Sequence, residues 1–136
     1  MVVLVLILAA AMVPAKVPTV KPPDTPAGRA LSEFVQTFNA GSETRRKWVE
    51  TRTTVHETPR ADILKSDEKL LQNDGRISVA RIVNSSPASV VAIVRHARSG
   101  AHGYLTINVE PAAPHKVVNL GMRAARPDEI KGSARQ

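Results

Sequence analysis

Four residues in the second half of the chain have side chains that could take part in chemistry. His96 and Tyr104 are acid–base residue types, and they fall near the facing ends of two predicted strands joined by a short loop. Such a hairpin could bring them near each other, although the residues of the third predicted strand that should face inward, Leu105, Ile107 and Val109, are apolar. Arg81 and Arg95 lie in strand segments, where a guanidinium could point into a pocket and bind an anion. Each arginine could equally extend its stem along the sheet and reach solvent at the rim.

No acid and base stand at a spacing that defines a catalytic motif. The histidines lack the i, i+4 spacing of a helical zinc site, and the chain has no cysteine to assist them. No glycine-rich loop follows a predicted strand, so nucleotide binding is unsupported. Ser66 and Lys69 match the S-x-x-K pattern of penicillin-recognising serine enzymes, but the partner motifs are missing. We therefore interpret Ser66 as an exposed helix residue and predict no catalytic residue, metal or cofactor.

The stretch Pro26–Gly41 is the clearest amphipathic helix of the sequence. Leu31, Phe34, Val35 and Phe38 follow the i, i+3, i+4, i+7 spacing that places them on one face. A threonine precedes the helix as a predicted N-cap, the proline suits its first turn, and Gly41 is expected to end it in the left-handed conformation.

Two further helices are predicted before the strands. The second begins at Ser42 as its cap and carries Trp48, which we expect to anchor in the core. The third begins at Thr58-Pro59 and ends at Asn73–Gly75. Its apolar face is formed by Ile63, Leu64, Leu70 and Leu71.

From Arg76 onward the apolar period changes to two. The predicted strands cover Arg76–Asn84, Ser89–Arg98, Tyr104–Glu110 and His115–Arg123, separated by turn residues. In the first of them, Ile77, Val79 and Val83 should share one face. Helices followed by an antiparallel meander predict an α+β fold, with the first helix covering the apolar face of a four-stranded sheet.

The two ends of the chain differ from this domain, which we place at residues 27–125. Residues 1–15 contain an apolar run too short to span a bilayer comfortably, and they predict an export signal or, if uncleaved, a membrane anchor. A buried strand or helix is the alternative. Residues 16–26 form a proline-rich linker. Residues 126–136 form a polar tail that we expect to be disordered.

The formal charge of +7 is concentrated in the strand half, where residues 75–136 carry nine basic and three acidic side chains. Its one aromatic residue is Tyr104, whereas nucleic-acid surfaces interleave basic side chains with stacking aromatics. We therefore expect a solvated basic face and no nucleic-acid partner.

Several short motifs resemble one family. FVQTFNAGSE (34–43) resembles the opening-helix signature of the nuclear transport factor 2-like domains, also called SnoaL-like or cystatin-fold domains. LTINVEPAAPHKV (105–117), LGMRAA (120–125) and the Ser-Ser-Pro turn (85–87) resemble the small secreted version found N-terminal to β-lactamase-like serine hydrolases. The resemblance covers residues 27–125.

This resemblance implies a cone, in which three N-terminal helices pack on a curved four-stranded antiparallel sheet with a pocket at the open end. The candidate pocket residues are Phe34, Phe38, Trp48, Arg81, Arg95, His96 and Tyr104. In larger relatives the pocket hosts isomerases, dehydratases and polyketide cyclases. The hydrolase-associated version implies a non-catalytic accessory role.

The expected function is therefore a secreted or membrane-tethered, non-catalytic module that binds a small apolar ligand or a partner hydrolase domain. One alternative is a small cone-fold isomerase or cyclase acting on an apolar substrate, with His96, Tyr104 or Arg95 near the reacting atoms. Another is a basic binder of an anionic polymer or membrane surface. A homodimer through the exposed face of the sheet is also left open. Phe34 and Phe38 would fill the volume that a substrate needs, which favours the non-catalytic interpretation.

Overall fold

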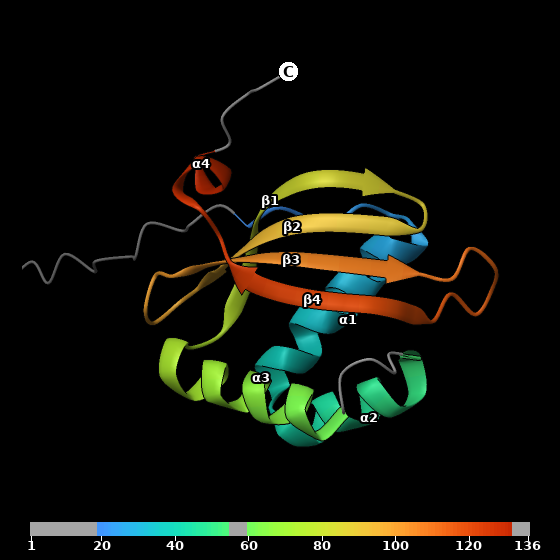
Figure 1. Cartoon of the computed structure of the whole chain (residues 1–136), viewed down its shortest axis with the longest axis horizontal. Coiled ribbons are helices and arrows are strands. Elements are labelled where there is room, and N and C mark those ends of the chain that lie inside the picture. The colour runs from blue at the N-terminus through green and yellow to red at the C-terminus, as the bar shows by residue number, and fades with distance from the viewer. Residues whose placement is uncertain (1–18, 55–59, 132–136) are drawn as a thin grey trace, which may run out of the picture.

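The computed structural model describes residues 19–54 and 60–131. The predicted export segment, the first part of the linker, the helix start at Thr58-Pro59 and the end of the tail lie outside these residues, as does the side chain of Ile63. Helices precede strands, which confirms the predicted α+β class (Figure 1). The elements are α1 (Pro26–Ala40), α2 (Ser42–Arg52), α3 (Arg60–Asp74), β1 (Ile77–Ser86), β2 (Ser89–His96), β3 (His102–Val109), β4 (Val117–Ala124) and α4 (Pro127–Ile130).

Helix α1 forms as its sequence predicts. The Thr25 side chain accepts a hydrogen bond from the Gly28 backbone N–H at 2.9 Å, and Pro26 occupies the first turn. Leu31, Phe34 and Phe38 are all buried on one face. The α1 helix therefore gives the core both phenylalanines of the chain.

The junction between α1 and α2 is a single glycine. Gly41 has φ 108° and ψ 177°, a backbone region open essentially to glycine alone. This geometry lies outside the left-handed helical region, so the prediction of a left-handed stop is wrong in ψ although it identified the need for glycine. Gly41 is also the N-cap of α2, and Ser42 is its first helical residue rather than its cap.

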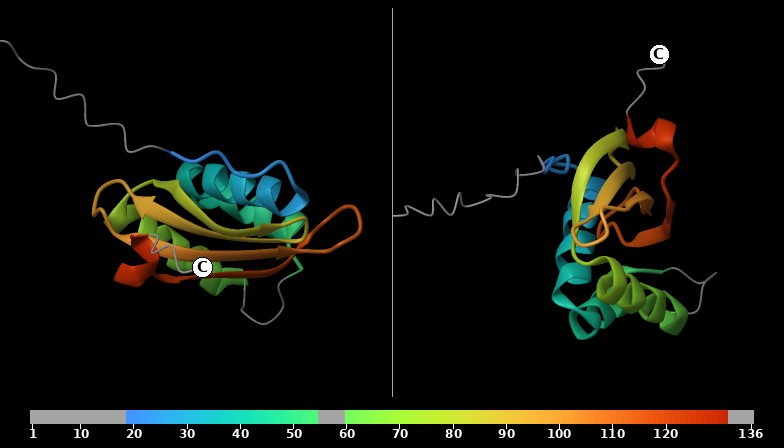
Figure 2. Two further views of the ribbon diagram at one scale, coloured as in Figure 1. Left: turned by 90° about the horizontal axis from the view of Figure 1, so that it is seen from above. Right: turned by 90° about the vertical axis from the view of Figure 1, so that its left-hand side faces the viewer.

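The four strands form one antiparallel sheet in the order β1-β2-β3-β4, as expected of a meander. Helix α1 packs against β1, β2 and β3 on one face of this sheet, while α2 and α3 lie beyond the β4 edge of the sheet (Figure 2). Strand β3 alternates strictly, with Leu105, Ile107 and Val109 buried toward α1 and the residues between them half-buried. The core is thus a layer between α1 and the sheet.

Strand β1 departs from strict alternation. Its pairing with β2 shifts register twice, once after Val79 and once after Ile82. Each shift changes which side of the strand faces the core. Ile82 consequently packs against the core, while Val83 is 38% exposed. The prediction that Val83 shares the buried face of Val79 is wrong for this reason.

The C-terminal segment folds onto the other face of the sheet (Figure 2). Arg81 of β1 donates to the backbone carbonyl of Glu129, and Arg123 of β4 binds the Glu129 carboxylate through two hydrogen bonds of 2.8 and 2.7 Å. On this outer face of β2, Ile93 is only 1% exposed. The expected disorder of the tail is therefore wrong for residues 126–131, where α4 forms.

Removing a ring from the core should lower stability. Phe38 is 2% exposed and stacks with Phe34 at a centroid distance of 6.1 Å. We expect Phe38→Ala to lower the free energy of unfolding by about 3–5 kcal/mol in urea titrations, because it leaves a cavity. The matched control Gln36→Ala, on the exposed face of the same helix, should change it by less than about 0.5 kcal/mol. Equal effects would contradict the placement of α1.

The ion pair of α4 should be visible in its titration. Hydrogen bonds from Arg123 and from the Arg126 backbone lower the pKa of Glu129 from 4.5 to about 2. The ionised form is therefore favoured in the folded state, and its contribution to stability is present above about pH 4.5 and lost as the pH falls toward 2. Carboxyl-carbon NMR should show the Glu129 pKa rising toward 4.5 in Arg123→Ala. Arg76→Ala, an exposed control, should leave it low; a normal Glu129 pKa in the unaltered protein would contradict this docking.

Candidate functional site

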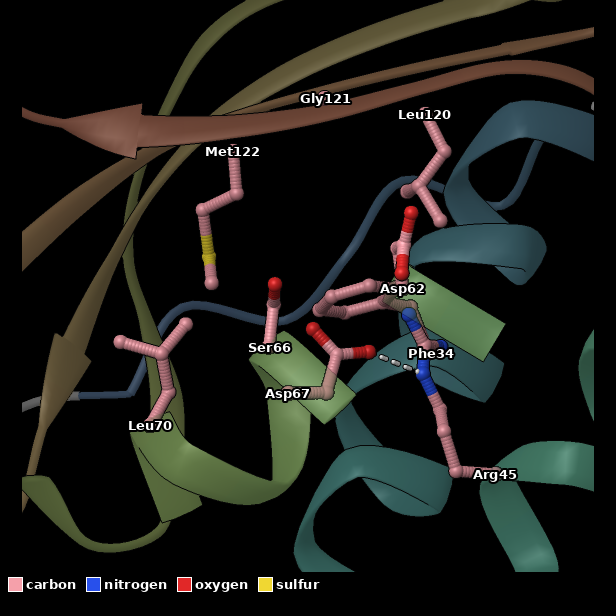
Figure 3. Close-up of a pocket in the computed structure, with 9 residues that line it drawn as sticks. All are labelled: Phe34, Arg45, Asp62, Ser66, Asp67, Leu70, Leu120, Gly121 and Met122. Carbon is pink, nitrogen blue, oxygen red and sulfur yellow. Dashed lines mark hydrogen bonds and ion pairs between the residues drawn. The ribbon is translucent and has the colours of Figure 1, made fainter. Parts of the chain in front are cut away.

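A cleft of about 290 Å³ separates α3 from β4 (Figure 3). Its lining comes from all three long helices and the last strand: Phe34, Arg45, Asp62, Ser66, Asp67, Leu70, Leu120, Gly121 and Met122. Helix α1 contacts the first three strands, so the inner side of β4 faces α3 across the cleft. The cleft therefore exists because one helix covers three of four strands.

The cleft has an apolar side and a polar side. Leu120 and Met122, which point from β4 toward α3, are only half-buried, and Leu70 faces them from α3. Asp62, Ser66 and Asp67 present oxygen atoms from α3. Such a mixture of apolar wall and a few convergent polar groups is typical of small-molecule sites.

A buried ion pair forms the back of the cleft. Arg45 of α2 is 1% exposed, and its Nε donates to Oδ2 of Asp67 on α3 at 2.6 Å. The guanidinium carbon lies 4.1 Å from the ring centroid of Phe34 and 4.8 Å from that of Trp48. The cation is thus held by one carboxylate and two aromatic faces, both of which attract it electrostatically.

The ion pair is incompletely hydrogen-bonded. Among the described residues, neither Nη1 nor Nη2 of Arg45 has an acceptor, and Trp48 Nε1 also lacks one. Burial lowers the pKa of Arg45 and raises the pKa of Asp67, and in each case the partner's charge opposes the shift. Unpaired buried donors are costly, and in native structures most buried polar groups are paired with another protein group or with ordered water.

The positions of Arg45 and Asp67 in the sequence already indicate that both side chains face inward, although neither residue belongs to a catalytic motif. Arg45 precedes Trp48 and Val49 by three and four positions, so it lies on the buried stripe of α2. Asp67 stands three positions before Leu70 on the inward side of α3. A charged residue at a core position of an amphipathic helix is the pattern that identifies this pair.

Three of the predicted pocket residues are aromatic side chains on helices, Phe34, Phe38 and Trp48, and all three are buried. Phe34 lines the cleft, and its ring meets that of Trp48 edge-on at 6.1 Å. Trp48 and Phe38 are 5% and 2% exposed and belong to the core. Trp48 therefore anchors α2 as expected, and it reaches the cleft through Phe34 and Arg45.

The four polar candidates are distributed over both faces of the sheet. His96 is buried on the inner face, with its ring 6.2 Å from that of Phe38. Tyr104 lies on the outer face, where the Arg123 guanidinium carbon sits 4.0 Å from its ring centroid. His96 and Tyr104 are consequently not brought together. Arg81 reaches α4, and Arg95 lies half-buried on the outer side of β2.

A second hollow of about 250 Å³ continues from the cleft, with Leu70 and Met122 in both linings. His96 and His102 line it together with Asp74. Over residues 19–54 and 60–131, no group of three or more histidine or carboxylate side chains is placed to hold a metal ion. Within the same residues, no helix combines the length and apolar character needed to cross a membrane.

No known protein family model matches the chain, and neither a curated protein sequence nor a solved structure matches it.

Replacing the whole pair should be tolerated better than breaking it. Asp67→Leu leaves the Arg45 charge buried without its carboxylate, and we expect a loss of about 3–5 kcal/mol in unfolding free energy. Arg45→Met together with Asp67→Leu removes both charges and should be more stable than Asp67→Leu alone. Urea titrations of the two single variants and the double variant measure this coupling. Additive losses would contradict a direct, buried interaction.

Proposed function

We propose that this chain is a non-catalytic ligand-binding module of the nuclear transport factor 2-like type, with the α3–β4 cleft as its binding site. The observation that carries the proposal is the cleft itself, about 290 Å³ with apolar walls and an incompletely bonded ion pair at its back. Its volume is at the lower end of the range for small-molecule sites, which favours a small ligand.

The junction that carries the family resemblance supports this type. The Asn39 side chain donates to the Ile77 carbonyl at 2.9 Å and accepts from the Ile77 N–H at 2.8 Å. The Asn39 side chain thus pairs with the Ile77 backbone as a neighbouring strand would, at the point where β1 begins. The Phe-Asn-Ala-Gly ending of α1 therefore has a structural role, as we expect of a motif that is typical of a fold. The N-terminal apolar run supports export, and the resemblance to the hydrolase-associated version of the family supports an accessory role beside a hydrolase domain.

The arrangement of the acid–base candidates favours binding over catalysis. His96 and Tyr104 lie on opposite faces of the sheet, and the rings of Phe34 and Phe38 occupy the interior. One observation favours the alternative of a small isomerase or cyclase: Asp67 lines the cleft with a pKa raised by burial, as suits a general base. Turnover of ketosteroid or lactone substrates that is lost in Asp67→Asn would establish that alternative.

Ligand binding can be measured through Trp48, the single tryptophan of the chain. Its ring contacts Phe34 and the Arg45 guanidinium, both of which line the cleft. We expect hexanol or cyclohexanol to change Trp48 fluorescence saturably and to shift the methyl NMR signals of Leu70, Leu120 and Met122.

A blocking variant and its neighbour provide the control. Ser66→Phe places a ring at the mouth of the cleft and should abolish these changes, whereas Lys65→Phe, on an exposed position outside the cleft, should preserve them. Saturable binding that Ser66→Phe leaves intact, or methyl shifts confined to other parts of the chain, would contradict the proposed site.

A further inference from the structure

We infer that the cleft selects ligands with a neutral amide head group, an inference that rests on the proposed function of the same cleft. The ion pair at its back places unpaired N–H donors beside a carboxylate oxygen that faces the cleft. An amide carries the complementary acceptor and donor side by side.

The donors belong to Arg45. A guanidinium has five N–H groups in a planar fork, and the Nε group is the one that binds Asp67. Nη1 and Nη2 have no acceptor among the described residues. The Arg45 side chain is only 1% exposed, and it lines the cleft. A carbonyl oxygen has two lone pairs and could accept from this fork. Binding would then satisfy donors that are costly to leave unpaired in the interior.

The acceptor belongs to Asp67. One of its oxygens accepts from Arg45, while the other points into the cleft on the side of Ser66 (Figure 3). An ionised carboxylate accepts hydrogen bonds and donates none, so this oxygen can bind an N–H or O–H group of a ligand in the cleft. The N–H of an amide whose carbonyl faces Arg45 would supply it.

Charge favours a neutral head over either ion. The charges of Arg45 and Asp67 already cancel, and a half-buried site disfavours an added net charge. A carboxylate head would meet Asp67 and Asp62 on the same wall. An ammonium head would be attracted by Asp62, but it would also meet the buried guanidinium, and it carries no acceptor for the unpaired Nη donors of Arg45. The apolar body of the ligand would lie against Leu120 and Met122, whose half-buried side chains face α3.

The test uses the whole chain and ligands that share a six-carbon chain: hexanamide, hexanoate, hexylamine, hexanol and N,N-dimethylhexanamide. NMR titration should give hexanamide a dissociation constant about tenfold below those of hexanoate and hexylamine, the ratio expected when one good hydrogen bond is gained. N,N-dimethylhexanamide lacks the N–H that would bind Asp67, so it should also bind about tenfold more weakly.

A variant separates head-group recognition from apolar binding. Asp67→Asn keeps an oxygen for Arg45 Nε but replaces the oxygen facing the cleft with an N–H donor. The preference for hexanamide over its dimethyl form should then fall to about one. Glu68→Gln makes the same chemical change at an exposed position on the same helix and should leave the preference unchanged.

The outcomes distinguish this inference from the proposed function. Tightest binding of hexanoate would overturn the inference in favour of an anion site, and tightest binding of hexylamine would overturn it in favour of a cation site. Equal binding of all heads in the cleft would also overturn it, while leaving the proposed function standing. Failure of every compound to bind in the cleft would overturn both.

Discussion

The positive charge of Arg45, buried between two aromatic rings, is the constraint on which the arrangement of the helices depends. Phe34 comes from α1, Arg45 and Trp48 from α2, and Asp67 from α3, so a single guanidinium contacts three helices. The charge must keep its carboxylate and its aromatic faces, because a buried ion without partners is strongly destabilising. The position of α3 relative to α1 is thereby fixed, and with it the width of the cleft opposite β4.

The edge position of β4 provides the other wall of the cleft. Helix α1 contacts β1, β2 and β3, and it leaves the inward side chains of β4 half-buried. On the opposite face the sheet is tied to α4, through Arg81 and Arg123, each of which binds Glu129. The strand is therefore held from the outer face while its inner face borders the cleft.

The fold could be predicted from the sequence wherever periodicity and local signals agree. Helix α1 combines an apolar stripe, a threonine cap and a following glycine, and β3 alternates strictly along its length. The bulges of β1 could not be predicted, because an inserted residue reverses the face of everything beyond it, as Val83 shows. The start of α4 has a typical helix signal, Pro127 followed by two acidic residues. The helix has only four residues, however, and the polar composition of the tail predicted disorder instead.

The candidate site was predicted only in part, at Phe34, since charged residues on helices are usually solvated. Arg45 is buried because Trp48 and Val49 share its face, and that pattern is visible in the sequence. Its pairing with Asp67 joins two helices and depends on tertiary packing that local spacing does not encode. His96 and Tyr104 could be assigned to their strands from the sequence. Which face of the sheet each side chain occupies depends on the two-residue period and on the residue at which each strand begins.

The most direct measurement of the central claim is the ¹⁵N NMR spectrum of the Arg45 guanidinium with and without hexanamide. The account predicts that the Nη signals shift on binding while the Nε signal, already bonded to Asp67, changes little. Unmoved Nη signals, with hexanamide bound at the Leu120 and Met122 methyl groups, would contradict a role for Arg45 in recognition.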